Sequence, residues 1–137
     1  MKIKQSLARF ALVGVVSGLL ACSAEEPAPH VSIVQPLDGA TVGRAVKVVM
    51  AVDGMKLHEA GEIIPGTGHF DLIVDGSYAP MGEMIVDDRE HHHFEKGETE
   101  GTIHLLPGDH VLTLQFANGH DKSYGHALGH SITVHVK

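Results

Sequence analysis

The chain has 137 residues, with 17 Asp and Glu, 10 Lys and Arg and 12 His, so its formal net charge is −7 at pH 7. An acidic surface repels the nucleic-acid backbone and attracts cations, which argues against nucleic acid as a partner. There is one cysteine, Cys22, which excludes an intramolecular disulfide and a metal site built from several cysteines.

The first 21 residues have the features of a secretory signal peptide. Lys2, Lys4 and Arg9 precede an apolar run over residues 10–21. This run is too short to span a bilayer, but it has the length of a signal-peptide core. We therefore expect residues 1–21 to be a signal peptide that is removed from the mature protein.

The end of this segment indicates a lipid anchor. The junction Leu19-Leu20-Ala21-Cys22 resembles the lipobox of bacterial lipoproteins. The resemblance implies cleavage before Cys22, lipidation of its sulfur and of the new amino terminus, and attachment to a membrane. Ser23 replaces the aspartate that usually retains a lipoprotein at the inner membrane, which favours the periplasmic face of the outer membrane. The alternative is an ordinary signal peptide followed by an incidental cysteine.

The mature part is more acidic than the whole chain. Cleavage removes three basic residues and no acidic one, leaving seven Lys and Arg against seventeen Asp and Glu, a formal charge of −10. All twelve histidines lie in this part. We expect residues 22–30 to be the lipidated cysteine and a flexible, proline-containing tether. Residues 31–137 are long enough to form one domain with its own core.

The pattern of this domain predicts strands and turns. Short segments in which every second residue is apolar alternate with Gly- and Pro-containing turns, and none has a sustained helical period. The clearest expected strands are residues 31–34, 45–52, 68–76, 99–106, 109–117 and 131–136. Pro107-Gly108 predicts a hairpin-like connection between two of them. We expect an immunoglobulin-like antiparallel β-sandwich of about seven strands, with a small β-barrel as the alternative.

Three consecutive histidines, residues 91–93, lie in an acidic connection between expected strands. In an extended chain, side chains two residues apart share a face, so His91 and His93 point one way and His92 and Phe94 the other. Two imidazoles on one face can bind one metal ion at about 2.0–2.1 Å. Glu95 and Glu90 are placed to orient these rings from outside the first coordination shell.

Other parts of the chain supply further candidate donors. His69 and Asp71 alternate with apolar residues, so we expect them on the face opposite the core. His110 has the parity of the apolar residues of its strand, and His120 follows the turn Asn118-Gly119. An isolated histidine is usually a surface residue or a core imidazole bonded to backbone. A histidine-rich, acidic, exported chain with no cysteine left for coordination nevertheless suits zinc, copper or nickel.

The chain contains three further motifs: Gly66-Thr67-Gly68-His69, His91-x-His93-Phe94-x-Lys96-Gly97-x-Thr99-Glu100 and Leu106-Pro107-Gly108-x-His110-x-Leu112. Together they resemble the domain of unknown function 4399 family, which is bacterial and mostly exported. The resemblance extends over residues 31–136. It implies that His69, His91, His93 and His110 are the histidine positions of the family. Asp71 stands where the family pattern often has a second histidine, and a carboxylate can also bind zinc or copper.

These observations support three alternative functions. The first is a lipid-anchored exported protein that binds copper or zinc for storage, delivery or tolerance, through His69, His91, His93 and His110, with Asp71 and His120 as further donors. The second is a metal-free module of the cell envelope that binds a protein partner or has a structural role, with the histidines in polar networks. The third, a small metalloenzyme, would need an open coordination position and a substrate pocket.

Overall fold

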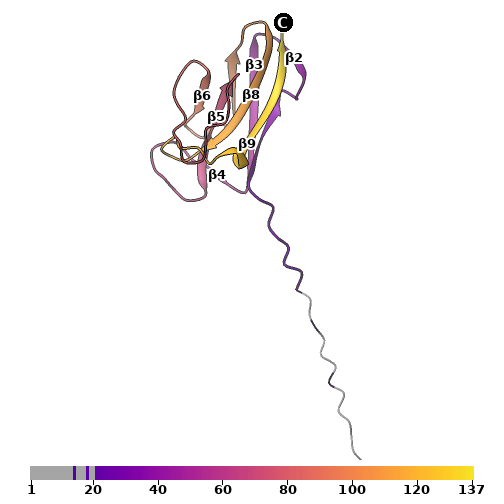
Figure 1. Ribbon diagram of the computed structural model, residues 1–137, viewed down its shortest axis with the longest axis vertical. Helices are drawn as coiled ribbons and strands as arrows, with labels where there is room; N and C mark the ends of the chain where they lie inside the picture. The colour runs from indigo at the N-terminus through magenta and orange to yellow at the C-terminus, as the bar shows by residue number, and fades with distance from the viewer. Residues whose placement is uncertain (1–13, 15–17, 19–20) are drawn as a thin grey trace, which may run out of the picture.

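The computed structural model of the chain describes residues 14, 18 and 21–137. The expected signal peptide, residues 1–21, therefore lies almost entirely outside the described residues. Residues 21–29 are exposed, have no regular secondary structure and run away from the folded domain (Figure 1). Among the residues described, no helix is long and apolar enough to cross a membrane.

The described chain forms two β-sheets, which confirms the predicted all-β sandwich. One sheet has three strands in the order β1-β3-β7, and the other has six, with the path β2-β9-β8-β5-β4 and β6 paired to β5. The strands are β1 (His30–Gln35), β2 (Ala40–Val42), β3 (Ala45–Asp53), β4 (Lys56–Leu57), β5 (Thr67–Val74), β6 (His91–Phe94), β7 (Glu100–His104), β8 (Gly108–Ala117) and β9 (Gly129–Val136), with a 3-10 turn η1 at His126–Leu128.

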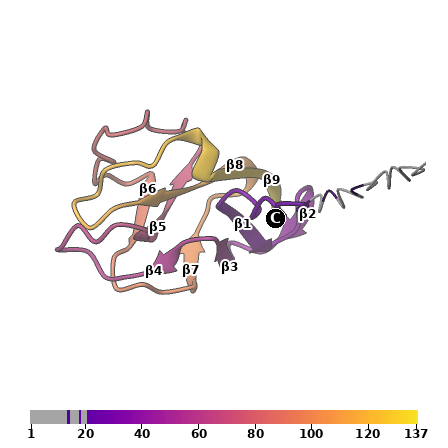
Figure 2. The same cartoon turned by 90° about the horizontal axis from the view of Figure 1, so that it is seen from below.

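The core lies between the two layers, which Figure 2 shows with β3 and β7 in one layer and β5, β6 and β8 in the other. Phe70 and Leu72 of β5 pair with Phe116 and Leu114 of β8, and all four side chains are fully buried. The rings of Phe70 and Phe116 meet edge to face, with their centroids 5.4 Å apart. From the other sheet, every second residue of β3 points inward, as the alternation predicts. Each fully buried side chain of this kind contributes about 1.5–3 kcal/mol to folding.

The predicted hairpin at Pro107-Gly108 is wrong. The strand before it, β7, pairs with β3 in the three-stranded sheet, and Leu105 N–H extends that ladder to the Arg44 carbonyl. The strand after it, β8, pairs with β5 and β9 in the other sheet. The connection therefore crosses from one layer to the other, because Ile103 and Leu105 are buried in the core from the side of the three-stranded sheet.

The outer face of the six-stranded sheet is covered by two loops, which we call the lid (residues 75–90 and 118–125). The two loops are joined through their backbones: Gly82 N–H donates to the Ser123 carbonyl, Ser123 N–H to the Glu83 carbonyl and Ile85 N–H to the Asp121 carbonyl, at 2.8, 2.9 and 2.8 Å. The lid removes from solvent a sheet face that alternation alone assigns to the surface. The polar residues on that face become the candidate site.

Candidate metal centre

The candidate site is formed first by the pairing of β5 and β6. In their antiparallel ladder Asp71 lies directly opposite His93, and His93 Nδ1 is 2.6 Å from Asp71 Oδ1. His69, two residues before Asp71, points to the same side, and its Nε2 is 3.6 Å from Asp71 Oδ2. The prediction that His69 and Asp71 share the face opposite the core is confirmed. Both side chains are nevertheless fully buried, because the lid covers them.

The lid contributes Asp121. Asn118 begins this turn, and its side-chain oxygen accepts hydrogen bonds from the backbone N–H groups of His120 and Lys122. Asp121 then adopts a left-handed conformation with φ of 56°, which non-glycine residues seldom adopt outside turns. Its Oδ1 atom lies 3.1 Å from His69 Nε2. The turn thus places a carboxylate against a buried imidazole.

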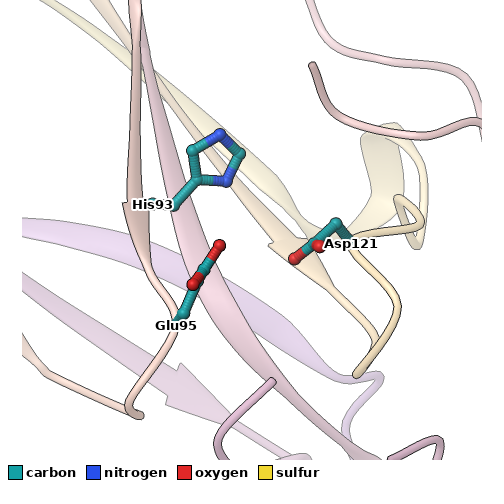
Figure 3. Close-up of side chains that lie close together, drawn as sticks. All are labelled: His93, Glu95 and Asp121. Atoms are coloured by element: carbon teal, nitrogen blue, oxygen red, sulfur yellow. The ribbon is translucent and has the colours of Figure 1, made fainter. Parts of the chain in front are cut away.

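Glu95 completes the group from the end of β6. It is exposed and has the same parity as His93, so it lies on the same side of the chain. His93, Glu95 and Asp121 each offer one donor atom within 4.8 Å of the others'. Figure 3 shows a ring nitrogen of His93 pointing toward the two carboxylates. Donors around one ion at about 2.0–2.2 Å lie roughly 3–4 Å from each other, so small side-chain movements bring these three to one ion.

The most informative feature of the site is its unsatisfied polar atoms. Six buried side-chain nitrogen and oxygen atoms in the described part of the chain have no hydrogen-bond partner, and all six belong to this cluster. They are His69 Nδ1 and Nε2, Asp71 Oδ1 and Oδ2, His93 Nδ1 and Asp121 Oδ1. Five of the six atoms lie within ion-pair distance of one another: His93 Nδ1 is 2.6 Å from Asp71 Oδ1, and His69 Nε2 is 3.6 Å from Asp71 Oδ2 and 3.1 Å from Asp121 Oδ1. None of these contacts has the alignment of a hydrogen bond. Buried polar groups without aligned partners are costly and rare, so the cluster has donors to offer to a further partner.

The protonation of His93 follows from its two neighbours. Its Nε2 atom lies 3.2 Å from the Val86 carbonyl, which can only accept, so this nitrogen carries a proton. In the neutral ring Nδ1 is then a lone pair directed toward the cluster, as metal coordination needs. Without a metal, the close Asp71 carboxylate raises the pKa of His93 to about 9, against the opposing effect of burial. A metal ion must therefore displace a proton from His93 at neutral pH.

The structure does not bring His110 to this site, so the expected convergence of four histidines is corrected. His110 Nδ1 is 2.7 Å from Asp75 Oδ2, and its Nε2 donates to the Leu106 carbonyl at 2.9 Å. Its strand, β8, runs antiparallel to β5, and Ala117 of β8 is the residue opposite His69. Ala117 is seven positions further along the extended strand than His110, a distance of about 23 Å.

His91 and His120 lie near the cluster but outside it. His91 shares the face of His93, as expected, with ring centroids 6.4 Å apart, but its Nδ1 is paired with Asp88 Oδ1 at 2.6 Å. His120 is exposed, and its neighbour Asp121 is the residue that the turn directs inward. Asp121 was not among the predicted donors. Its position next to His120, after a turn dipeptide, was the only signal for it in the sequence.

A groove of about 400 Å³ runs beside the cluster, between β6 and β7. It is lined by the three histidines of β6, by Glu95 and Asp87 and by residues 101–103 of β7. His93 and Glu95 border both the groove and the cluster, so the groove lies next to the buried donors.

The protein is therefore a β-sandwich that carries a buried histidine–carboxylate cluster under a two-loop lid. A family model described as a domain of unknown function (DUF4399) matches residues 48–137, about two thirds of the chain. The chain belongs to this family. The match contains every residue of the cluster but starts within β3, later than the resemblance seen in the sequence. No curated protein and no solved structure matches the chain.

Proposed function

We propose that the protein binds a divalent transition-metal ion, zinc or copper(II), in the cluster formed by His69, Asp71, His93, Glu95 and Asp121. The observation that carries this proposal is the set of six buried polar atoms without hydrogen-bond partners. A dication placed among them satisfies imidazole nitrogens and carboxylate oxygens together and offsets the burial of negative charge. Water or an apolar residue would supply no positive charge.

The donor types narrow the choice of metal. The cluster offers two imidazoles and three carboxylates and no sulfur, which suits ions of intermediate softness and disfavours copper(I). Zinc accepts both nitrogen and oxygen ligands at about 2.0–2.2 Å. Copper(II) binds such sites more tightly than zinc by the general order of affinities. Five candidate donors are enough to fill the coordination of either ion, which favours storage, delivery or tolerance over catalysis.

We further propose that the protein acts in the cell envelope, attached by lipid on Cys22 to the periplasmic face of the outer membrane. The lipobox-like junction and the exposed free thiol of Cys22 support this address. The exposed stretch at residues 21–29 would act as a tether that lets the domain extend away from the membrane surface. Fatty-acid labelling of cells that express wild type and Cys22→Ala tests it. Label on wild type alone supports the anchor, and equal label on both rejects it.

A metal-free envelope module, bound to a protein partner or purely structural, is the second candidate, and one observation favours it. His93 Nδ1 and Asp71 Oδ1 are 2.6 Å apart, and the pKa of His93 is raised to about 9 by that contact. A protonated His93 therefore already supplies one positive charge to the cluster. The metal-free arrangement leaves His69 Nδ1 without a polar contact and gives His69 Nε2 only the unaligned contact with Asp121 Oδ1 at 3.1 Å, which is why we place this candidate second.

The test is a metal titration of the untagged protein. Zinc, copper(II) and nickel are titrated into metal-free wild type, into His93→Gln and into His135→Gln, with calorimetry and melting temperature as readouts. His135 is the matched control, because it also pairs with an aspartate, Asp109, at 2.6 Å, but on the exposed face of β9. We expect one ion per chain, with wild-type affinity in His135→Gln and much weaker binding in His93→Gln. Binding in wild type at 100 times the Kd should add about 2.7 kcal/mol to stability.

Two results decide against the proposal. Equal affinity in the three proteins means nonspecific binding to surface histidines. No binding to wild type favours the metal-free module.

A further inference from the structure

Gln115 is a buried polar residue next to the cluster but not a member of it. It lies on β8 directly opposite Asp71, on the outer face of the sheet, and is fully buried. Its Oε1 accepts the backbone N–H of Ala79 at 3.0 Å, and its Nε2 donates to the Ala79 carbonyl at 3.1 Å. Nε2 also donates to Ser123 Oγ at 3.0 Å. One side chain thus fixes a residue in each loop of the lid to the rigid sheet.

Ser123 strengthens this connection. Its hydroxyl donates to the Ala79 carbonyl at 3.0 Å and accepts the Gly125 backbone N–H at 2.8 Å, and the side chain is almost fully buried. Gln115, Ala79 and Ser123 therefore form a closed polar network in which every donor has an acceptor. Networks of this kind hold their members in one arrangement, and losing one partner leaves the others unsatisfied.

Both loops held by this network contribute to the metal centre. The loop of Ser123 carries Asp121, two residues earlier, whose carboxylate contacts His69. The loop of Ala79 carries Val86, whose carbonyl fixes the proton on His93 Nε2 and so directs Nδ1 to the ion. The backbone bond between Ile85 N–H and the Asp121 carbonyl links the two loops at the site itself.

We propose that Gln115 is a positioning residue of the metal centre. Its amide holds the lid against β8, and the lid in turn sets the place of the Asp121 carboxylate and the orientation of the His93 ring. This inference rests on the proposed metal-binding function. Packing alone does not require an amide here, because a methionine of similar length fills the same space without any of the three hydrogen bonds. Supporting groups of this type affect metal affinity by about 10–100-fold when they are removed.

The experiment compares wild type, Gln115→Met and Thr113→Val in the full, untagged chain, with zinc for affinity and cobalt(II) for visible spectra. Thr113 is the matched control on the same face of β8. Its hydroxyl bonds Ser131 and, at the start of the lid, the Gly76 carbonyl, but it takes no part in the network of Ala79 and Ser123. We expect Gln115→Met to bind zinc about 10–100-fold more weakly and to show a changed cobalt spectrum. Thr113→Val should keep the wild-type affinity and spectrum.

Hydrogen exchange of the metal-free proteins gives a readout that a general loss of stability does not mimic. In Gln115→Met the amides of Ala79, Gly82 and Ser123 should exchange faster, while those at the centres of β8 and β9 stay protected. Ser123→Ala removes part of the same network, so it should also weaken zinc binding and speed the exchange of the lid amides. This variant provides the test if Gln115→Met does not fold.

The outcomes separate this inference from the proposed function. If wild type binds zinc and Gln115→Met binds it equally well with an unchanged cobalt spectrum, the role of Gln115 is refuted and the metal site stands. If wild type binds neither metal, both proposals fail together.

Discussion

His93 and Asp71 face each other across the ladder of β5 and β6, with Nδ1 and Oδ1 2.6 Å apart and without the alignment of a hydrogen bond. Both side chains are fixed in position. The Val86 carbonyl accepts a hydrogen bond from the other ring nitrogen of His93, and Asp71 belongs to β5, which has strands paired on both sides. Two donors fixed this way, next to His69 and Asp121, need little reorganisation to bind an ion. Pre-organised donors bind more tightly, because little ordering remains to be done.

Proton release should accompany metal binding. The pKa of His93 is raised to about 9 by the Asp71 carboxylate, so at pH 7 the metal-free ring is protonated and the bound ring is not. We expect close to one proton released per ion at pH 7. Calorimetric titrations of zinc in buffers of different ionisation enthalpy measure this number. A heat of binding that is the same in every buffer means no proton is displaced, which contradicts a role for His93 Nδ1.

Asp121→Asn should weaken zinc binding but should not lower the stability of the metal-free protein. The substitution keeps the size of the side chain but removes a negative charge that lies close to the Asp71 carboxylate. Zinc affinity should fall at least about tenfold, because a charged ligand is lost. The metal-free protein should be equally or more stable, because the partly buried Asp121 side chain no longer adds its negative charge to that of Asp71.

Melting curves of wild type and Asp121→Asn, each with and without zinc, measure the change in zinc binding and the change in metal-free stability. Asp109→Asn is the control, since Asp109 pairs with a histidine at an exposed position. Lower stability of metal-free Asp121→Asn, together with unchanged zinc affinity, favours a metal-free ion pair between His69 and Asp121.

The pair of His110 and Asp75 predicts a pH dependence of stability that is independent of metal. The side-chain hydrogen bond that His110 donates to Asp75 raises the pKa of His110 above its usual value of about 6.5. A raised folded-state pKa stabilises the protein fully below the unfolded value, and the stabilisation is lost as pH rises through the folded value. The stability advantage of wild type over Asp75→Asn should be largest between about pH 5 and 6.5 and should shrink above that range.

Urea unfolding of both proteins over a pH series measures this advantage. Asparagine suits the left-handed conformation of Asp75 and keeps an oxygen for the Val111 N–H, so the comparison isolates the charge. An advantage that grows with pH contradicts the assignment.

The core should respond to truncation as a tightly packed interior does. Leu114 is fully buried opposite Leu72, and Leu114→Ala should lower the free energy of unfolding by about 2–5 kcal/mol. Val111, on the same strand, is 40% exposed, and Val111→Ala should change the free energy of unfolding by less than about 1 kcal/mol. Denaturant unfolding measures both. Equal effects would show that β8 does not form the core of the sandwich.

Local alternation in the sequence was sufficient to predict which side chains share a face. It placed His69 with Asp71, and His91 with His93, because a strand repeats every two residues whatever its neighbours are. It did not show which strands pair. His69 and His110 both lie near the beginnings of their strands, and β5 and β8 prove to be antiparallel neighbours, so the two histidines lie at opposite ends of the sheet.

Residues in loops were the least predictable part of the site. Asp121 reaches the cluster because it adopts a left-handed conformation within a turn. Gln115 lies on a strand, but its hydrogen bonds to the lid exist only because the lid loop folds over it. Neither relationship has a period or a motif that sequence patterns report. Burial of His69 and Asp71 has the same origin, since alternation predicts their face but not what covers it.

The most direct measurement is an anomalous difference map, collected at the zinc absorption edge, from crystals of the zinc-loaded protein. The proposed site predicts one peak under the lid, about 2.0–2.2 Å from His93 Nδ1 and from an oxygen each of Glu95 and Asp121, with His69 and Asp71 next to the ion. Peaks confined to histidines outside the cluster, such as the half-buried His110 or the exposed His135, or no peak at all, would contradict this site.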